Sequence, residues 1–112
     1  MVDLVIKVEG YRFKASDVIS YYDDTDYEYG YDHERLDTKN YKVYIDLKRK
    51  DSITIDCGTF DPTWEGDDEG IENAQKRIGE ILNTIDRQMD EYQRLVNEFN
   101  IAKVQSGGFN RR

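Results

Sequence analysis

Hydrophobic and polar residues alternate at the start of the chain in the pattern of a β-hairpin. The alternation runs through residues 4 to 8 and resumes through residues 11 to 14. Successive side chains of a strand point to opposite faces, so each run gathers its apolar residues on one face. Between the runs, Glu9-Gly10 supplies a glycine that tolerates the positive φ of a two-residue turn. The pattern predicts two antiparallel strands joined by that turn.

The clearest strand in the sequence covers residues 41 to 48. Its odd-numbered residues are apolar or aromatic, and the residues between them point to the other face. A polar turn and a second alternating run, residues 52 to 57, follow directly. Residues 18 to 22 are rich enough in β-branched and aromatic side chains for a further strand. Together these runs predict an antiparallel sheet of four or five strands with one face in water.

A heptad pattern begins at Ile71 and predicts a long amphipathic helix. Large apolar residues recur every seven positions from Ile71 to Phe99, and a second row three positions later is interrupted by Gln88. We expect the helix to cover residues 69 to 103 and to end before the glycines of residues 106 to 108.

The predicted fold class is α+β, with an N-terminal antiparallel sheet followed by one long C-terminal amphipathic helix. A chain of 112 residues is long enough for one domain with a modest core. That domain would cover residues 1 to 105, with the sheet over 1 to 57 and an acidic linker over 58 to 68. The helix would complete it, and residues 106 to 112 would form a flexible tail.

The predicted helix is longer than the predicted sheet. Residues 69 to 103 span about 50 Å as a helix, whereas a strand of six to eight residues spans about 20 to 27 Å. Either the helix breaks near Gly79 or Asn83-Thr84 and lies across its own sheet, or its distal half packs on a second copy. The second alternative predicts a homodimer whose interface consists of the apolar residues Ile85, Met89, Tyr92, Leu95, Val96 and Phe99.

Charge changes this picture because it is concentrated in two segments. Residues 17 to 37 and 51 to 75 hold sixteen of the 24 acidic residues but only one of the 16 basic residues, Arg35. Two concentrated segments create a directional negative field that attracts a basic partner and repels nucleic acid and anionic membranes. The alternative interpretation is a solvated surface that keeps the protein soluble.

Tyrosine is interleaved with acid in the first of these segments, which favours binding over mere solubility. Tyrosine combines a large apolar face with a hydrogen-bonding tip and loses little entropy on ordering. With a neighbouring carboxylate it can hold lysine or arginine through cation–π contact and paired hydrogen bonds. The predicted partner-binding residues are Tyr22, Asp23, Asp24, Asp26, Tyr27, Glu28, Tyr29, Tyr31, Asp32, Glu34, Asp61, Trp64, Glu65, Asp67, Asp68 and Glu69.

The sequence contains no recognisable catalytic motif, cofactor motif or typical metal motif. His33 is the only histidine, so one subunit cannot assemble a histidine-based triad or a typical zinc site. Cys57 has the period of a strand core residue, and no glycine-rich phosphate loop is present. Residues 23 to 28 invite a calcium interpretation, but Tyr29 and Arg35 occupy positions that an EF-hand reserves for glycine and glutamate. We expect no enzyme activity and no cofactor, with irregular calcium or metal binding as an alternative.

In size and charge, the chain resembles the small acidic inhibitors that bacterial viruses and mobile elements carry, including DNA mimics and anti-CRISPR proteins. The acidic, tyrosine-rich stretch from Asp17 to Asp37 and the acidic stretch from Asp51 to Glu72 carry the resemblance, without a shared motif. The resemblance implies an inhibitor that occupies the basic, nucleic-acid-binding site of a partner protein with carboxylates in place of phosphates. From the residues, with one cysteine and no signal peptide, we expect a cytoplasmic protein. No apolar run has the length of a signal peptide or membrane span, and we expect no direct binding to nucleic acid or membrane. The main alternative is a homo-oligomerising module that uses the heptad helix.

Overall fold

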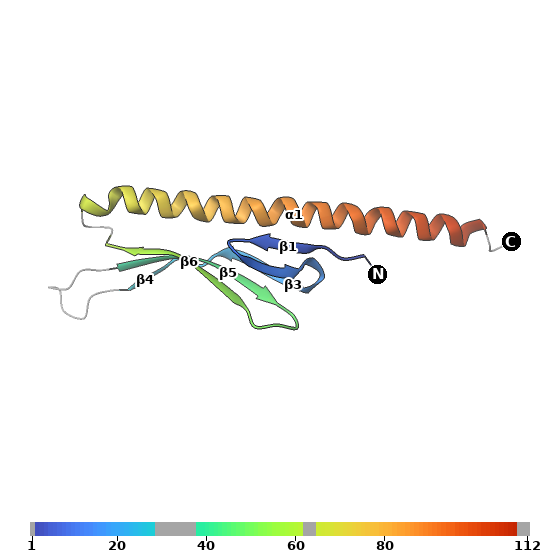
Figure 1. Cartoon of the computed structure of the whole chain (residues 1–112), viewed down its shortest axis with the longest axis horizontal. Coiled ribbons are helices and arrows are strands. Elements are labelled where there is room, and N and C mark those ends of the chain that lie inside the picture. The colour runs from blue at the N-terminus through green and yellow to red at the C-terminus, as the bar shows by residue number, and fades with distance from the viewer. Residues whose placement is uncertain (1, 29–37, 62–64, 110–112) are drawn as a thin grey trace. The chain divides into compact units, whose positions relative to one another are not determined.

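The computed structural model describes residues 2–28, 38–61 and 65–109, and the chain divides into two compact units. The terminal unit comprises residues 1–16 and 84–112, and the central unit comprises residues 17–83. The division lies within the single domain predicted from the sequence. The fold class is α+β, as predicted, with six strands and one long C-terminal helix in the described residues (Figure 1).

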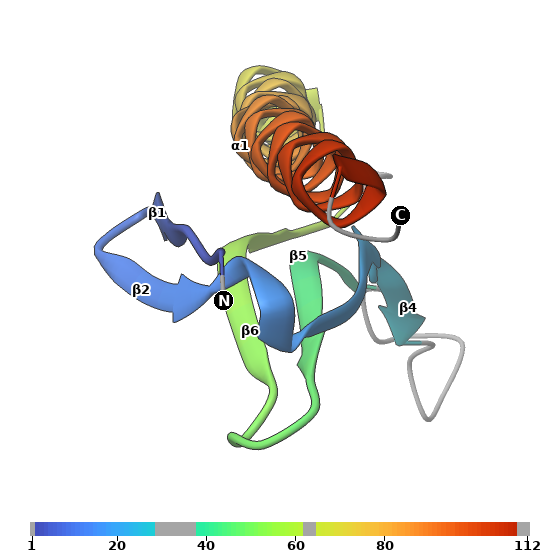
Figure 2. The ribbon, with the colours of Figure 1, turned by 90° about the vertical axis from the view of Figure 1, so that its right-hand side faces the viewer.

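The terminal unit contains the predicted hairpin. Strand β1 (Val5–Val8) pairs antiparallel with β2 (Tyr11–Lys14), and Figure 2 shows the two strands side by side. Glu9 and Gly10 have φ values of 48° and 80°. Positive φ at both central residues is the geometry of the type I′ turn that matches the twist of a hairpin. The sequence prediction of this turn is confirmed.

Gln88 joins the helix of the terminal unit to the edge of its hairpin. Its side-chain oxygen accepts a hydrogen bond from the Lys7 backbone N–H, and its nitrogen donates to the Lys7 carbonyl, both at 2.9 Å. The amide thereby satisfies both backbone groups that β1 turns away from β2 at this position. This double contact explains why a polar residue interrupts the apolar row of the heptad. Ile6, Phe13 and Ile85 are fully or almost fully buried in the same unit.

The central unit is built on an antiparallel sheet with β5 (Thr38–Leu47) in the middle. Strands β3 (Val18–Asp23) and β4 (Asp26–Glu28) pair with one edge of β5, and β6 (Ile53–Phe60) pairs with the other. The Asp24 N–H donates to the Lys42 carbonyl at 2.9 Å, which continues the ladder between β3 and β4.

Two features of the strands differ from the sequence prediction. The strands form two separate sheets, because the hairpin pairs only with itself. Strand β4 was not predicted, since two of its three residues are acids with low β propensity, and its extended form depends on pairing with β5.

A bulge bends β6 at Cys57. Tyr41 pairs with Gly58 whereas Lys42 pairs with Asp56, so Cys57 is the extra residue. Gly58 has a φ of 121°, and a Cβ there would lie 2.6 Å from the Phe60 ring. The bulge lets β6 continue to Phe60, three residues past its predicted end.

The helix α1 (Asp68–Phe109) follows a short 3₁₀ turn, η2 (Glu65–Asp67), and is continuous over 42 residues. The predicted break near Gly79 or Asn83-Thr84 is therefore wrong. The helix also includes residues 104–109, where the sequence predicted an end and a flexible tail. Glycine lowers helix propensity by about 1 kcal/mol but does not forbid the conformation. No helix in the described residues is both long enough and apolar enough to cross a membrane.

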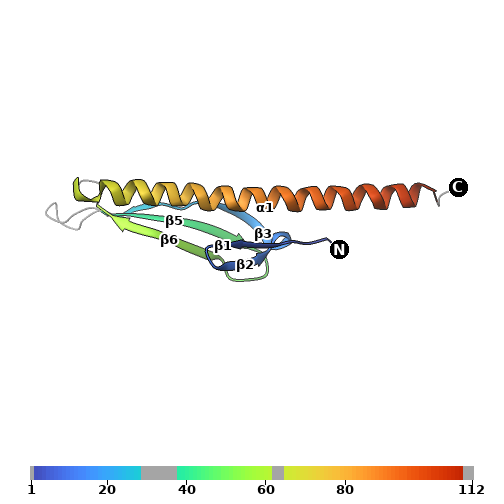
Figure 3. The same ribbon diagram turned by 45° about the horizontal axis from the view of Figure 1, so that its top comes forward.

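The core of the central unit lies between the sheet and the first turns of α1. Figures 1 and 3 show the yellow part of the helix running along β5 and β6. The Arg77 guanidinium donates to the Asp56 carbonyl at 3.3 Å. The odd-numbered residues of β5 are buried, as their alternation predicted. The buried side chains of this unit include Tyr41, Val43, Ile45, Leu47, Ile55, Cys57, Ala74, Ile78 and Ile81.

An ion pair joins Asp17, the last residue of the 3₁₀ turn η1 (Ala15–Asp17) before β3, to the turn after β5. The buried Asp17 carboxylate accepts hydrogen bonds from the backbone N–H and the Nε of Arg49, at 3.1 and 3.0 Å. The hydrogen bond from the Arg49 side chain is the main cause that lowers the pKa of Asp17, and the Arg49 backbone and nearby positive charges add to it.

A lowered pKa in the folded state makes stability depend on pH in a defined window. The stabilisation is present above the unfolded-state pKa, about 3.9 for aspartate, and is lost as the pH falls through the lower folded pKa. We expect Asp17→Asn to lower the melting temperature by several degrees at pH 7, and the difference from wild type to shrink below about pH 4. Asp51→Asn, in an exposed position, is the control. A difference in melting temperature that is constant from pH 7 to pH 2 would contradict the assignment.

Candidate functional site

The face of the central sheet opposite its buried row carries most of the polar side chains of the unit. Strand alternation and register place these side chains together, because paired residues point to the same face. We call this surface the open face. Among the described residues it includes Tyr22, Asp24, Asp26 and Glu28 from β3, β4 and their link, Asn40, Lys42, Tyr44 and Asp46 from β5, and Thr54, Asp56 and Thr59 from β6.

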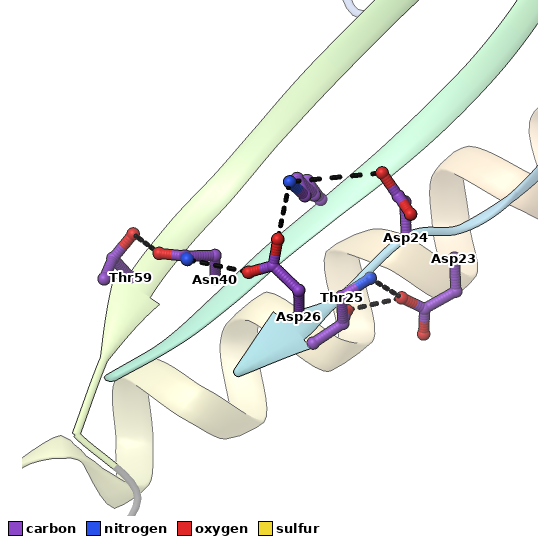
Figure 4. A network of polar contacts seen from close by, with 7 residues as sticks. Asp23, Asp24, Thr25, Asp26, Asn40 and Thr59 are labelled. Carbon is purple, nitrogen blue, oxygen red and sulfur yellow. Dashed lines mark hydrogen bonds and ion pairs between the residues drawn. The ribbon is translucent and has the colours of Figure 1, made fainter. Parts of the chain in front are cut away.

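Lys42 is held by two carboxylates near the middle of the open face. Its Nζ lies 2.9 Å from Asp26 Oδ2 and 4.0 Å from Asp24 Oδ2. Figure 4 marks both contacts with dashed lines from the ammonium nitrogen to the two aspartates. The hydrogen bond with Asp26 raises the pKa of Lys42 and lowers the pKa of Asp26. The open face therefore already holds one cation with paired carboxylates.

A chain of side-chain hydrogen bonds fixes Asp26 from the other side. Asn40 Nδ2 donates to Asp26 Oδ1 at 2.7 Å, and Thr59 Oγ1 donates to Asn40 Oδ1 at 2.8 Å (Figure 4). The chain crosses the sheet from β4 to β6. Because Asp26 is restrained on both oxygens, its position is set before any partner arrives.

Tyr22 and Tyr44 form an aromatic pair next to these acids. Their ring centroids are 5.5 Å apart with planes inclined by 48°, and Tyr22 is 46% exposed. Partial desolvation is the main cause that raises the pKa of Tyr22, followed by the charge of Asp24, the neighbouring Tyr44 and the charge of Asp46. The Tyr22 hydroxyl thus stays protonated near neutral pH, as an exposed apolar ring with a hydrogen-bond donor among carboxylates.

Carboxylates outnumber cations on the open face. Within its strands, five carboxylates face one ammonium group, Lys42. Two of the five are tied locally, since Asp46 accepts a hydrogen bond from Ser52 Oγ and Asp56 accepts one from the Gly58 N–H, both at 2.9 Å. These bonds leave the charges in place. The face therefore has a net negative charge that can attract a cation.

Of the predicted partner-binding residues, four come together on the open face: Tyr22, Asp24, Asp26 and Glu28. Asp23 and Tyr27 do not join them. Strand alternation turns these two side chains to the other face of the sheet, where they pair with Val43 and Lys39. The Asp23 carboxylate instead accepts hydrogen bonds from the backbone N–H and hydroxyl of Thr25. The prediction treated the stretch as one loop, whereas pairing with β5 separates alternate residues.

The second acidic stretch is partly structural. Asp61 is buried, and its backbone N–H donates to Asp67 Oδ2 at 2.9 Å, so these two residues build the corner before α1. The prediction that Asp61 is a displayed, partner-binding carboxylate is therefore wrong, and the half-buried Asp67 is tied to the backbone of Asp61. Asp68 and Glu69 are exposed in the first turn of α1, where negative charge stabilises the helix. The side chains of Tyr29, Tyr31, Asp32, Glu34, Trp64 and Glu65 lie outside the described residues.

Sequence reasoning missed most of the open face. The residues that were not predicted as site residues are Asn40, Lys42, Tyr44, Asp46, Thr54, Asp56 and Thr59. Alternation had already placed the even-numbered residues of β5 opposite its core row. Only the register with β3 and β6 shows which acids and tyrosines stand beside them.

The described residues contain no group of three or more His, Cys, Asp or Glu side chains that could hold a metal ion. Asp24 and Asp26, which belonged to the calcium alternative, bind Lys42 instead.

The predicted oligomer interface on α1 loses one residue. Ile85 is fully buried within a single chain, so it is not available to a second copy. Phe99 is 45% exposed and Ile101 is 57% exposed. Met89, Tyr92, Leu95 and Val96 are half-buried.

No protein-family model, curated protein or solved structure matches this chain.

Proposed function

We propose that this chain is a non-catalytic protein-binding inhibitor whose open face docks on the basic, nucleic-acid-binding surface of a partner protein. The observation that carries the proposal is the Tyr22–Tyr44 pair, in which Tyr22 is exposed and Tyr44 half-buried, beside the carboxylates of Asp24 and Asp46. An apolar centre bordered by charge is the arrangement found at specific protein interfaces.

The regular spacing of the acids supports a partner that binds nucleic acid. Asp24, Asp26 and Glu28 have the same parity along one edge of the sheet. Alternate residues of an extended strand lie about 6.7 Å apart. This edge therefore offers a row of evenly spaced negative charges, and a surface that follows a phosphate backbone has its basic residues arranged for such a row.

Lys42 sets the strength of this interaction. A lysine or arginine of the partner must compete with the Lys42 ammonium for Asp24 and Asp26. Lys42→Gln removes the competitor and makes the open face more negative, so it should speed association with a basic partner. Lys39→Gln is the matched control, because Lys39 carries the same charge on the other face, where its Nζ lies 5.4 Å from the centre of the Tyr41 ring.

The test compares two variants: one in which the three acids of this row are neutralised, and one in which three acids elsewhere are neutralised. The partner is the protein retained by immobilised wild type from a bacterial lysate at low salt and released at high salt, identified by mass spectrometry. Asp24→Asn, Asp26→Asn and Glu28→Gln together should slow association at least tenfold in surface plasmon resonance at low salt. The control variant Asp51→Asn, Glu72→Gln and Asp90→Asn makes the same change in net charge at exposed positions away from the open face, and should have a much smaller effect. Tyr22→Ala should mainly speed dissociation.

The proposal fails if affinity is independent of salt and the two triple variants bind alike. Salt is informative because the Debye length falls from about 10 Å at 0.1 M to about 3 Å at 1 M. Circular dichroism melting curves establish that each variant is folded at the temperature of the binding measurement.

A second candidate function is self-association through the distal part of α1. The exposed Phe99 and Ile101 favour it, because large apolar side chains in contact with water are stabilised by burial in an interface. In this alternative the acids serve solubility, and neutralising the open face leaves assembly unchanged.

A further inference from the structure

The two compact units carry opposite net charge. The central unit contains 18 acidic and 8 basic residues, for a net charge of −10, whereas the terminal unit contains 6 acidic and 8 basic residues, for a net charge of +2. The negative charge of the whole chain therefore belongs to the unit with the open face. The positive charge of the terminal unit needs its own explanation.

Three cations gather on one face of the hairpin in the terminal unit. The pairing of β1 with β2 sets Lys7 opposite Arg12 and Val5 opposite Lys14, and all four side chains are exposed. We call these four residues the basic face. Val5 is 48% exposed, so the basic face combines an apolar contact with its charges.

The positive charges of the basic face repel one another and so destabilise the hairpin. Lys7 and Arg12 form a pair without hydrogen bonds to each other, because the Lys7 backbone groups point outward to Gln88. Side chains lie closest in such pairs, and like charges directly opposite each other are destabilising. Within the described part of the chain, no salt bridge involves Lys7, Arg12 or Lys14, and Lys14 has only a longer-range attraction to the exposed carboxylate of Asp3. An anionic partner would relieve the repulsion.

We propose that the basic face docks on the open face of a second copy of this chain. The inference rests on the same open face as the proposed function and names a further partner for it. Charge complementarity supports the pairing, since three exposed cations would meet five carboxylates that share one ammonium group. Each face also has an apolar part, Val5 on the hairpin and the Tyr22–Tyr44 pair on the sheet.

A second copy fits the basic face better than nucleic acid does. The chain has a net charge of −8, and its field repels a polyanion before three cations can make contact. A second copy also has a net charge of −8, but its excess negative charge belongs to one unit and its other unit has a net charge of +2, so it repels the basic face less than a polyanion with a charge on every nucleotide does. Binding to nucleic acid is the outcome that would replace this proposal.

The contact is heterologous, because it joins two different surfaces. After one contact, one copy still has a free open face and the other still has a free basic face, so association continues into longer assemblies or closes into a ring. The contact is small and strongly charged, which makes it weak and sensitive to salt. It also covers the open face, so self-association at high concentration competes with binding of the basic partner.

The experiment uses two variants that each destroy one of the two surfaces. The hairpin variant carries Lys7→Glu, Arg12→Glu and Lys14→Glu, and the sheet variant carries Asp24→Asn, Asp26→Asn and Glu28→Gln. Sedimentation velocity is measured at low and high salt, where the Debye length is about 30 Å at 0.01 M and about 3 Å at 1 M. Wild type should associate with rising concentration at low salt and be monomeric at high salt.

Mixing the variants decides whether the contact is heterologous. Each variant alone should associate at least tenfold more weakly than wild type. An equimolar mixture should form a one-to-one dimer and nothing larger, because only the intact basic face of the sheet variant and the intact open face of the hairpin variant can meet. Lys76→Glu, Arg87→Glu and Lys103→Glu together reverse three exposed helix cations as the matched control, and this control should still associate.

Several results would overturn the proposal. A wild type that is monomeric at low salt and high concentration would do so, as would a mixture of variants that stays monomeric. Association that is abolished only by Leu95→Glu with Phe99→Glu would assign assembly to α1 instead. Binding of a single-stranded DNA oligonucleotide to wild type that is lost in the hairpin variant would assign the basic face to nucleic acid. The hairpin variant should still bind the basic partner through its open face, so this inference can fail while the proposed function stands.

Discussion

Ile45→Ala is expected to destabilise the protein by about 2 to 5 kcal/mol, the usual range for removing a fully buried isoleucine side chain. Ile45 is fully buried on the central strand β5, where Tyr21 of β3 and Ile53 of β6 are its paired neighbours. Strands on both sides hold β5 in place, so the sheet cannot collapse easily into the space that the side chain leaves.

Ile19→Ala is the matched control for this substitution. Ile19 is 55% exposed, at the irregularity between Val18 and Ser20 in β3, and its replacement should change stability by no more than about 0.5 kcal/mol. Urea unfolding followed by circular dichroism measures both variants. Equal effects of the two substitutions would show that the odd-numbered row of β5 is not the core.

Gly58→Ala is expected to destabilise the protein by about 1 to 3 kcal/mol, the cost of holding a non-glycine residue in a rarely populated backbone region. Gly58 has a φ of 121°, and the added Cβ would lie 2.6 Å from Cε2 of Phe60. The substitution therefore adds steric conflict to backbone strain at the β6 bulge.

Gly79→Ala should instead stabilise the protein. Gly79 lies inside α1, and a Cβ there would meet nothing within 4 Å. Alanine should therefore stabilise the helix by about 0.5 to 1 kcal/mol. Thermal melting of the two variants provides the comparison. Stabilisation by Gly58→Ala would contradict the bulge geometry, and destabilisation by Gly79→Ala would contradict a continuous helix.

The open face connects these structural features to the proposed function. The bulge at Cys57 puts Thr59 opposite Asn40, whose amide then reaches Asp26. The strain accepted at Gly58 thus helps to position a carboxylate of the site. A variant that removes the bulge should affect binding as well as stability, whereas Gly79→Ala should leave binding unchanged.

The sequence predicted those elements whose signals are local. The Glu9-Gly10 turn, the alternation of β5 and the heptad of α1 each depend on residues close together in the chain, and all three are present. The extent of the helix was harder to predict, because the glycines near its end permit a helix as well as its termination. Strand β4 escaped prediction because an acidic segment becomes extended only when a partner strand supplies its hydrogen bonds.

By itself, the sequence determined the α+β class, the concentration of acids and the apolar row that forms the core of the central sheet. Only the tertiary structure decided which charges act together. Pairing with β5 put Asp24 and Asp26 around Lys42, separated them from Asp23, and brought Tyr22 beside Tyr44. The physical reason is that strand register is a non-local property: a shift of one residue moves every side chain to the opposite face, and no local pattern in an acidic, tyrosine-rich stretch fixes that choice.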